Sequence, residues 1–304
     1  MFKHLIVPLD GSQLSEAVLP VAIQLAQRLD ASVTLVHVIE RNAPKAVHGE
    51  RHLSEPSQAE AYLKALMKRM FPPGLRVESH VHTTAITDVA RSIVEHTKEF
   101  ESDLVMMSTH GRSGLRDLFF GSIAQQIVSL GVPVLLVRPE EGRDHPKFTG
   151  KPLLVPLDGT PLREQALAAA SFLAASFGTG IKLLMVVPTL QTLAGVENAS
   201  KVILPATTQE MLDLMNEDAV AYLEQLVSRL KSEGREVTGE IERGDPAEMI
   251  VAAAQRQEID LIVMGTAGKT GMNAFWSSSV APKISSRTHL PMLLIPVRGG
   301  SEKL

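Results

Sequence analysis

With 304 residues, 44% of them hydrophobic, and a net charge of −4, the chain has the composition of a globular protein long enough for two domains. The lack of a basic excess argues against nucleic acid and anionic membranes as partners. The sequence contains no cysteine, which excludes disulfides, thiolate chemistry and cysteine metal ligands. No apolar run approaches the roughly 20 residues of a membrane helix. Residues 1–4 lead into a strand-like segment without a signal-peptide pattern, so we expect a cytoplasmic protein.

The first half of the chain alternates short apolar runs with segments of helical periodicity. The apolar runs predict five strands, at Leu5–Leu9, Ser32–Ile39, Leu75–His82, Asp103–Ser108 and Val132–Val137. The helical segments lie between them, at Ser15–Leu29, 57–70, Ile86–Phe100 and Gly121–Leu130. Ser57 and Glu60 have the spacing of a capping box, which predicts the start of the second helix.

The second half repeats this order of elements. Its apolar runs predict strands at Leu153–Leu157, Ile181–Val187, Glu236–Ile241, Leu261–Gly265 and Pro291–Val297. A long helix is predicted from Thr207 to about Lys231. Asp245 and Pro246 predict the sharp start of another helix, with aspartate at the cap and proline in the first turn.

The two halves are related by duplication. The segment at residues 7–11 recurs at 155–159, 148 residues later, and the apolar run at 133–137 recurs at 291–295, 158 residues later. Offsets that grow only slightly indicate a repeated domain with small insertions in the second copy. We therefore expect domains at 1–140 and 151–304, joined by a polar linker rich in proline and glycine at about 141–150.

Strict alternation of strand and helix predicts parallel βαβ units with right-handed crossovers. Five strands per domain favour an α/β fold with two tandem flavodoxin-like, or Rossmann-like, domains, each a five-stranded parallel sheet with helices on both faces. In such sheets ligands bind beyond the carboxyl ends of the strands, where the winding reverses. The first and fourth strands are expected to be neighbours there. Asp10 and the segment 108–111 would then meet in one crevice.

The segment 108–111 is glycine-spaced and leads, nine residues later, to a helix start at Gly121 and Ser122. A helix N-terminus offers free N–H groups and a positive dipole potential, which suits phosphate. Glycine lets a phosphate oxygen approach the backbone closely, and Asp10 could accept hydrogen bonds from ribose hydroxyls. The pattern therefore predicts a phosphate-binding loop, and the matching segment 265–268 predicts a second one.

These linked motifs resemble the universal stress protein family in its tandem form. The resemblance covers residues 1–138 and 152–297 and rests on the 7–12 segment, the end of the second strand, the glycine loop and the final apolar run, each seen twice. The family signature is glycine, two residues, glycine, nine residues, glycine, then serine or threonine. Ser108 replaces the opening glycine in the first copy, whereas Ser278 replaces the closing glycine in the second. Because Ser278 places a Cβ at the expected phosphate approach, we rank the first site above the second.

The resemblance implies binding of an adenine nucleotide, ATP, ADP or AMP, with or without Mg²⁺. In the first domain it assigns base, ribose and phosphate contacts to Pro8, Leu9, Asp10, Val38, Met107, Ser108, His110, Gly111, Gly121, Ser122 and Ile123. In the second domain the matching residues are Pro156, Leu157, Asp158, Val186, Met264, Gly265, Gly268, Ser278, Ser279 and Val280.

The sequence contains no Walker loop, nucleophile elbow or His-Glu zinc helix. We therefore expect a regulatory, stress-response protein that binds nucleotide and acts on an unidentified protein partner. One alternative is a slow ATPase or phosphotransferase, which His110, Arg112 and Lys269 would serve as phosphate-side groups. Another is a degenerate scaffold that binds no nucleotide and works through protein contacts.

Two further expectations concern histidines and strand edges. His80 and His82 share one face of a strand, and His48 and His52 could share a helix face, but surface histidines are commoner than ligands, so no metal site is expected. The resemblance implies that the final strands of the two domains pair with each other across a pseudo-twofold, which makes one chain an intrachain pseudo-dimer. A homodimer of two such chains is compatible with it.

Overall fold

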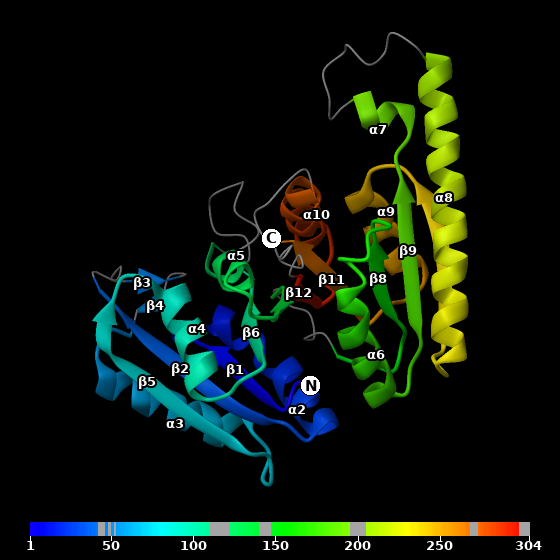
Figure 1. Cartoon of the computed structure of the whole chain (residues 1–304). Coiled ribbons are helices and arrows are strands. Elements are labelled where there is room, and N and C mark those ends of the chain that lie inside the picture. Colours follow the sequence, from blue (N-terminus) through cyan, green and yellow to red (C-terminus); the bar gives the residue numbers. More distant parts are fainter. Residues whose placement is uncertain are drawn as a thin grey trace, which may run out of the picture. The chain divides into compact units, whose positions relative to one another are not determined.

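The computed structural model describes residues 1–41, 46–47, 50–51, 53–109, 122–139, 147–194, 205–267 and 273–297. It divides into two compact units (Figure 1). The first unit contains Met1–Thr149 together with His289–Arg298, and the second contains Gly150–Thr288. Among the described residues, no helix has both the length and the apolar character needed to cross a membrane.

The first unit is a mostly parallel sheet of six strands. In chain order its elements are β1 (His4–Pro8), α1 (Gln13–Glu16), α2 (Leu19–Leu29), β2 (Ser32–Glu40), the short strands β3 (Ala46–Val47) and β4 (Glu50–Arg51), α3 (Pro56–Met70), β5 (Val77–Ile86), α4 (Val89–Glu99), β6 (Leu104–Ser108), α5 (Ser122–Ser129), β7 (Val134–Val137) and β12 (Met292–Val297). The sheet order is β12-β7-β6-β1-β2-β5. The winding reverses between β1 and β6, which pair directly, as expected for the first and fourth strands.

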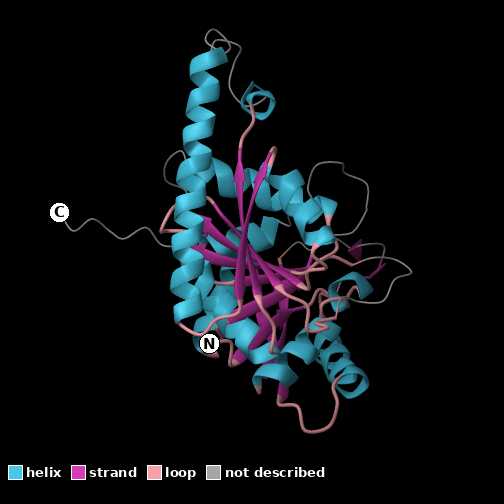
Figure 2. Ribbon diagram, turned by 90° about the vertical axis from the view of Figure 1, so that its right-hand side faces the viewer, coloured by secondary structure: helices cyan, strands magenta, loops and turns pink. Residues whose placement is uncertain are grey.

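The central strands are buried because helices cover both faces of the sheet (Figure 2). Leu5, Ile6 and Val7 of β1 have no exposed surface. In Figure 1, α4 lies in front of this sheet and contacts β2, whereas α3 lies behind it and contacts β2 and β5. The continuous apolar runs of the sequence are therefore explained by burial on both sides, which confirms the α/β class.

Three local predictions in this unit are wrong. The expected helix 15–29 is broken into α1 and α2, and Pro20 stands in the first turn of α2, where its missing N–H costs nothing. The capping box at Ser57 does not form, because α3 begins earlier, at Pro56. Strand β5 runs on to Ile86, and α4 begins only after Asp88, whose carboxylate accepts from the Arg91 N–H at 2.9 Å.

The second unit repeats the arrangement. Its elements are β8 (Leu153–Leu157), α6 (Gln165–Phe177), β9 (Ile181–Val187), α7 (Leu190–Ala194), α8 (Pro205–Ser232), β10 (Val237–Arg243), α9 (Pro246–Arg256), β11 (Leu261–Ala267) and α10 (Asn273–Arg287). The strand order β10-β9-β8-β11 matches β5-β2-β1-β6 of the first unit. The predicted start of α9 is confirmed, since Asp245 accepts from the Glu248 N–H at 3.1 Å.

The last strand of the second repeat, β12, belongs to the first compact unit. β12 pairs antiparallel with β7, and Leu293 lies opposite Leu135. The expected pairing of the two final strands is confirmed. Both residues are fully buried, so the pair carries part of the apolar core of the first unit.

One side-chain cluster occurs in both units. In the first, Glu16 accepts from the Tyr62 hydroxyl at 3.0 Å and pairs with Arg69. In the second, Glu164 accepts from the Tyr222 hydroxyl at 2.8 Å and from Arg229 at 2.5 Å. In the first unit the cluster connects α1 to α3. In the second it connects the residue that precedes α6 to α8.

Candidate functional site

Asp10 is held at the carboxyl end of β1 by its own loop. Its Oδ1 accepts from the backbone N–H of Ser12 at 2.9 Å and from the Ser12 hydroxyl at 2.6 Å. Gly11 adopts a φ of +92°, and a Cβ there would lie 2.8 Å from Leu53. Only glycine fits this turn without strain, so the Asp-Gly-Ser sequence fixes the position of the carboxylate.

A cavity of about 210 Å³, hereafter the Asp10 pocket, opens beside this carboxylate. It lies where the winding of the sheet reverses, and residues from β1, β2, α4 and β6 all reach it. Its lining consists of Pro8, Leu9, Asp10, Leu14, Ser15, Val36, His37, Val38, Glu40, Val89, Ile93, Met107, Ser108 and Ile123. Crevices at this point of α/β sheets are the usual ligand sites of the architecture.

The walls of the Asp10 pocket are mostly apolar, with a few polar groups. Val38 and Ile93 present aliphatic surface suited to a flat ring, whereas Asp10 and Glu40 supply carboxylates that can accept from hydroxyls. His37 is buried, with Nδ1 2.8 Å from the Leu9 carbonyl oxygen and Nε2 2.9 Å from that of Leu53. Such a mixture is typical of small-molecule pockets.

Seven of the residues predicted for the first site line this pocket, namely Pro8, Leu9, Asp10, Val38, Met107, Ser108 and Ile123. Ser122 is the first residue of α5, and its side chain is not among those described. His110, Gly111, Arg112 and Gly121 lie outside the described residues. The structure thus brings together the part of the site contributed by the strand ends.

The matching carboxylate of the second unit has the same loop but a different neighbour. Asp158 Oδ1 accepts from the Thr160 N–H at 3.0 Å and from its hydroxyl at 2.6 Å. Its Oδ2 accepts from Arg163 Nε at 3.1 Å. Arg163 also donates from Nη1 to the Gly265 carbonyl oxygen at 2.8 Å, and only 3% of this residue is exposed.

Arg163 therefore bridges two of the residues predicted to bind nucleotide in the second domain. Its counterpart in the first copy is Ser15, since each residue follows its aspartate by five positions. The Ser15 hydroxyl donates to the Ser12 carbonyl oxygen at 2.8 Å, and Ser15 lines the open pocket. A guanidinium thus occupies, in the second unit, hydrogen-bonding positions on Asp158 and Gly265.

The other predicted residues of the second site have the following places. Pro156 and Leu157 end β8, Val186 lies in β9, Met264 and Gly265 lie in β11, and Ser278, Ser279 and Val280 lie in α10. Val280 is buried. The side chains of Ser278 and Ser279 are not described, and Gly268 and Lys269 fall outside the described residues.

Sequence reasoning missed several pocket residues. Val89 and Ile93 are spaced by four on α4 and so share the face that meets the sheet. The signal for Arg163 was present in the duplication, because an arginine stands where the first copy has a serine. Comparing the two copies position by position would have found it.

Residues 1–138 and 150–296 match the universal stress protein family. A universal stress protein of Methanocaldococcus jannaschii is 29% identical over 145 residues, which are 45% of this chain and 83% of that protein. A universal stress protein A homologue of Coxiella burnetii is 31% identical over 133 residues, 42% of this chain and 89% of that protein. A crystal structure of a universal stress protein from Archaeoglobus fulgidus shares the fold, with a TM-score of 0.71 at 18% identity over 97% of this chain and 99% of that one.

Proposed function

Because the chain belongs to the universal stress protein family, with one family domain in each half, we propose that it binds one adenine nucleotide in the Asp10 pocket. The observation that carries the proposal is this pocket, which lies at the winding reversal with Asp10 in its wall. ATP, ADP and AMP share the base and ribose that this part of the site would hold.

The chemistry of the pocket supports this ligand class. Val38 and Ile93 offer apolar surface to the adenine ring, and Asp10 offers a carboxylate oxygen to the ribose hydroxyls. The phosphates would extend toward the N-terminus of α5, because the N-terminal end of a helix favours anions. Mg²⁺ could accompany them, since it binds mainly through phosphate oxygens.

We further propose that the bound nucleotide acts as a regulatory signal in a stress response rather than as a substrate. The carboxylates of Asp10 and Glu40 in the wall of the Asp10 pocket can accept hydrogen bonds from the hydroxyls of a bound ligand, which suits binding. Occupancy would alter the affinity of the chain for a protein partner in the cytoplasm.

The first experiment titrates nucleotide-free protein with ATP, ADP and AMP, with and without Mg²⁺, by calorimetry. We expect about one nucleotide per chain. The variant Ser15→Arg should reduce its affinity at least about tenfold, or about 1.4 kcal/mol, because an arginine at this position would lie against Asp10 as Arg163 lies against Asp158.

The control variant is Ser129→Arg, which adds the same charge at an exposed position on α5 and should bind as the wild type does. Absence of binding by all three nucleotides at about 1 mM would contradict the proposal and favour a scaffold without nucleotide. Wild-type affinity in Ser15→Arg would contradict the location. Formation of ADP at about 1 per second or faster would instead indicate an enzyme.

A further inference from the structure

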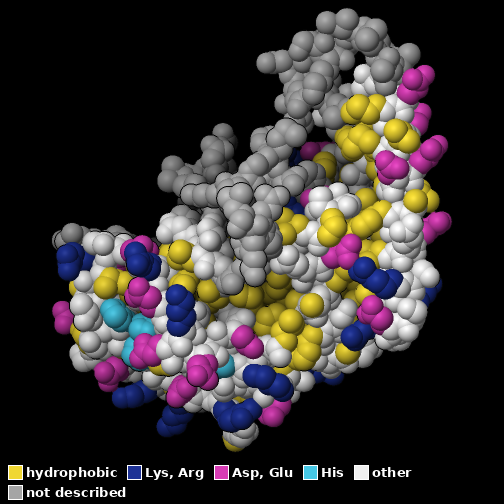
Figure 3. All heavy atoms as spheres, in the orientation of Figure 1, with side chains coloured by type: hydrophobic (Ala, Val, Ile, Leu, Met, Phe, Trp, Pro, Cys, Tyr) yellow, Lys and Arg dark blue, Asp and Glu magenta, His cyan; other side chains and the backbone are white. Residues whose placement is uncertain are grey.

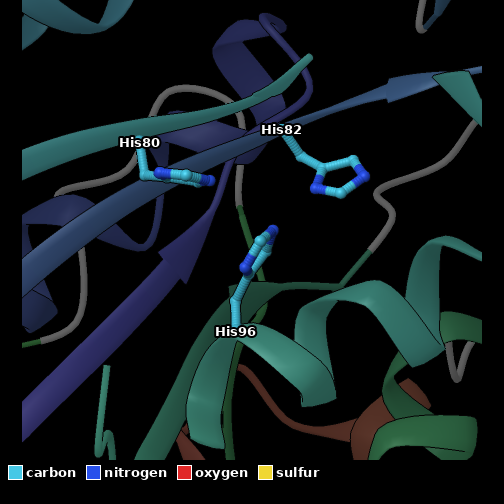
Figure 4. Close-up of side chains that lie close together, drawn as sticks. All are labelled: His80, His82 and His96. Atoms are coloured by element: carbon cyan, nitrogen blue, oxygen red, sulfur yellow. The ribbon is translucent and has the colours of Figure 1, made fainter. Parts of the chain in front are cut away.

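Three histidine side chains, those of His80, His82 and His96, lie close together in the first unit, next to the Asp10 pocket. His80 and His82 alternate along β5 and therefore point to the same face of the sheet. His96 comes from α4, which packs over that face (Figure 4). Each imidazole offers one nitrogen, and these three nitrogens lie within 4.8 Å of one another.

The burial and hydrogen bonding of the His96 ring suit it to bind a metal ion. Its ring is buried, with 5% exposed, and its Nδ1 lies 2.9 Å from the carboxylate of Glu99. If Nδ1 donates this bond, Nε2 carries the free lone pair. Nε2 is buried and has no hydrogen-bond partner in the described structure, and an unpaired buried acceptor costs free energy. A carboxylate behind the ring is the usual support of a metal-binding histidine.

The other two rings are placed to complete the site. The His96 ring lies 4.7 Å from that of His80 and 5.1 Å from that of His82, centroid to centroid, at interplanar angles of 66° and 61°. Phe100 stacks on His96 at 16° and holds its orientation. Burial, and then the neighbouring His96, lower the pKa of His80.

His80 and His82 are only half-buried, and histidine side chains gather on the visible face of the first unit (Figure 3). An ion could therefore enter from solvent, and water could serve as the fourth ligand. Nitrogen donors of this kind suit Zn²⁺, whereas Mg²⁺ and Ca²⁺ prefer oxygen ligands.

We propose that His80, His82 and His96 bind one Zn²⁺ ion, with Glu99 as the partner that orients His96. Tetrahedral zinc at 2.0–2.1 Å from each nitrogen needs the nitrogens about 3.3 Å apart. Rotation of the two half-exposed side chains on β5 closes the remaining gap, because His96 and the backbone are already in place.

The zinc ion would join β5 to α4. The same helix contributes Val89 and Ile93 to the Asp10 pocket, and His82 lies in register with Val38 of β2, another pocket residue. The metal would therefore fix one wall of the pocket without contacting the ligand. This site stands on its own residues and does not depend on the proposed nucleotide.

The experiment is a zinc titration of chelator-treated, nucleotide-free full-length protein, with metal content measured by mass spectrometry and affinity by competition with a chromogenic chelator. We expect one Zn²⁺ per chain with a dissociation constant below about 1 μM. The double variant His80→Gln with His82→Gln should weaken binding at least about 100-fold. Glu99→Gln should weaken it about 10- to 100-fold, as the loss of such a support usually does.

The matched control is the double variant His48→Gln with His52→Gln, which removes the other histidine pair and should bind zinc like the wild type. Heteronuclear spectra of the imidazole nitrogens should show zinc-dependent shifts at His80, His82 and His96 only. Absence of stoichiometric binding would overturn the proposal, and so would wild-type affinity in folded His80→Gln with His82→Gln. If the double variant His48→Gln with His52→Gln lost zinc binding, the site would lie elsewhere, and the proposal would be overturned.

Discussion

At the scale of single residues, one position distinguishes the two copies of the domain. Both units hold an aspartate at the end of their first strand by the same turn, with bonds to the residue two positions later. Five positions after that aspartate, the first copy has Ser15 and the second has Arg163. A small hydroxyl side chain leaves a cavity in the first case, whereas in the second a guanidinium lies between Asp158 and Gly265.

Replacing that arginine should open the second site. Arg163→Ser removes one partner of a buried ion pair, so we expect the nucleotide-free protein to lose about 3–5 kcal/mol of stability. In return, the carboxylate of Asp158 becomes available to ribose hydroxyls. Calorimetry should show the nucleotide stoichiometry rising from about one to about two per chain.

The control for this prediction is Arg163→Ser combined with Asp158→Ala, which removes the acceptor as well and should bind one nucleotide. A stoichiometry of one in folded Arg163→Ser would contradict the prediction, because it would show that removing Arg163 is not enough to open the second site.

The sequence alone could place Asp10 and Ser108 at one crevice, because strand ends and sheet order follow from the alternation of elements. It could not anticipate His96 beside His80 and His82. Their common face on β5 follows from alternation, but the face of α4 that meets the strand is set by tertiary packing. To recognise the three histidines as one ligand set, both the alternation along β5 and the packing of α4 must be known.

At the scale of elements, the repeated Glu-Tyr-Arg cluster connects two helical segments in each unit. Burial, and then the charge of Glu16, raise the pKa of Tyr62. Burial, then the hydrogen bond to Glu164 and the charge of Glu164, raise the pKa of Tyr222. Each phenol therefore stays protonated and donates to a carboxylate in a partly buried place, where hydrogen bonds to charged groups contribute most.

We expect Tyr62→Phe to destabilise the first unit by about 1.5–3 kcal/mol, because it removes one hydrogen bond to a charged acceptor. Urea unfolding measures the change. Because the folded pKa is raised above the ordinary value of about 10, the contribution of Tyr62 should be complete below about pH 10 and should decline as the pH rises further.

Lys64→Ala serves as the control on the same helix. It breaks an exposed pair with Glu60, which is worth about 0.5 kcal/mol or less. If Tyr62→Phe costs no more than this control, the cluster does not stabilise the junction of α1 and α3.

Boundaries of helices were the least predictable elements. Asp245 was recognised as a cap because Pro246 and Glu248 follow it at favourable positions. Ser57 had equally good spacing for a capping box, yet α3 begins at Pro56, since the fixed φ of proline favours the first helical position. Two local signals compete at the start of α3, and the helix begins at the proline.

At the scale of the whole molecule, the first unit is completed by β12, a strand that follows the second unit in the sequence. β12 hydrogen-bonds to β7, and Met292, Leu293 and Leu294 are buried. Without this strand, β7 would be an open edge of apolar residues, and such edges promote association between chains.

A chain that ends after residue 288 should therefore associate or lose protection at β7, although every residue of the first repeat is present. Size-exclusion chromatography with light scattering and hydrogen exchange at 134–137 would detect this. A chain that ends after Val297 keeps β12 and should behave like the full-length protein. A monomeric shorter chain with full protection at β7 would contradict the prediction.

This dependence on β12 has a consequence for synthesis on the ribosome. Residues 1–149 leave the exit tunnel well before β12, the strand that covers their open edge, because residues 150–288 lie between them in the sequence. Domains usually fold in the order in which they are made; here β7 stays uncovered until nearly all of the second unit has been translated. Chaperones could bind this exposed edge throughout that time. A chain released before β12 is translated would expose β7 and would be prone to aggregate with other chains.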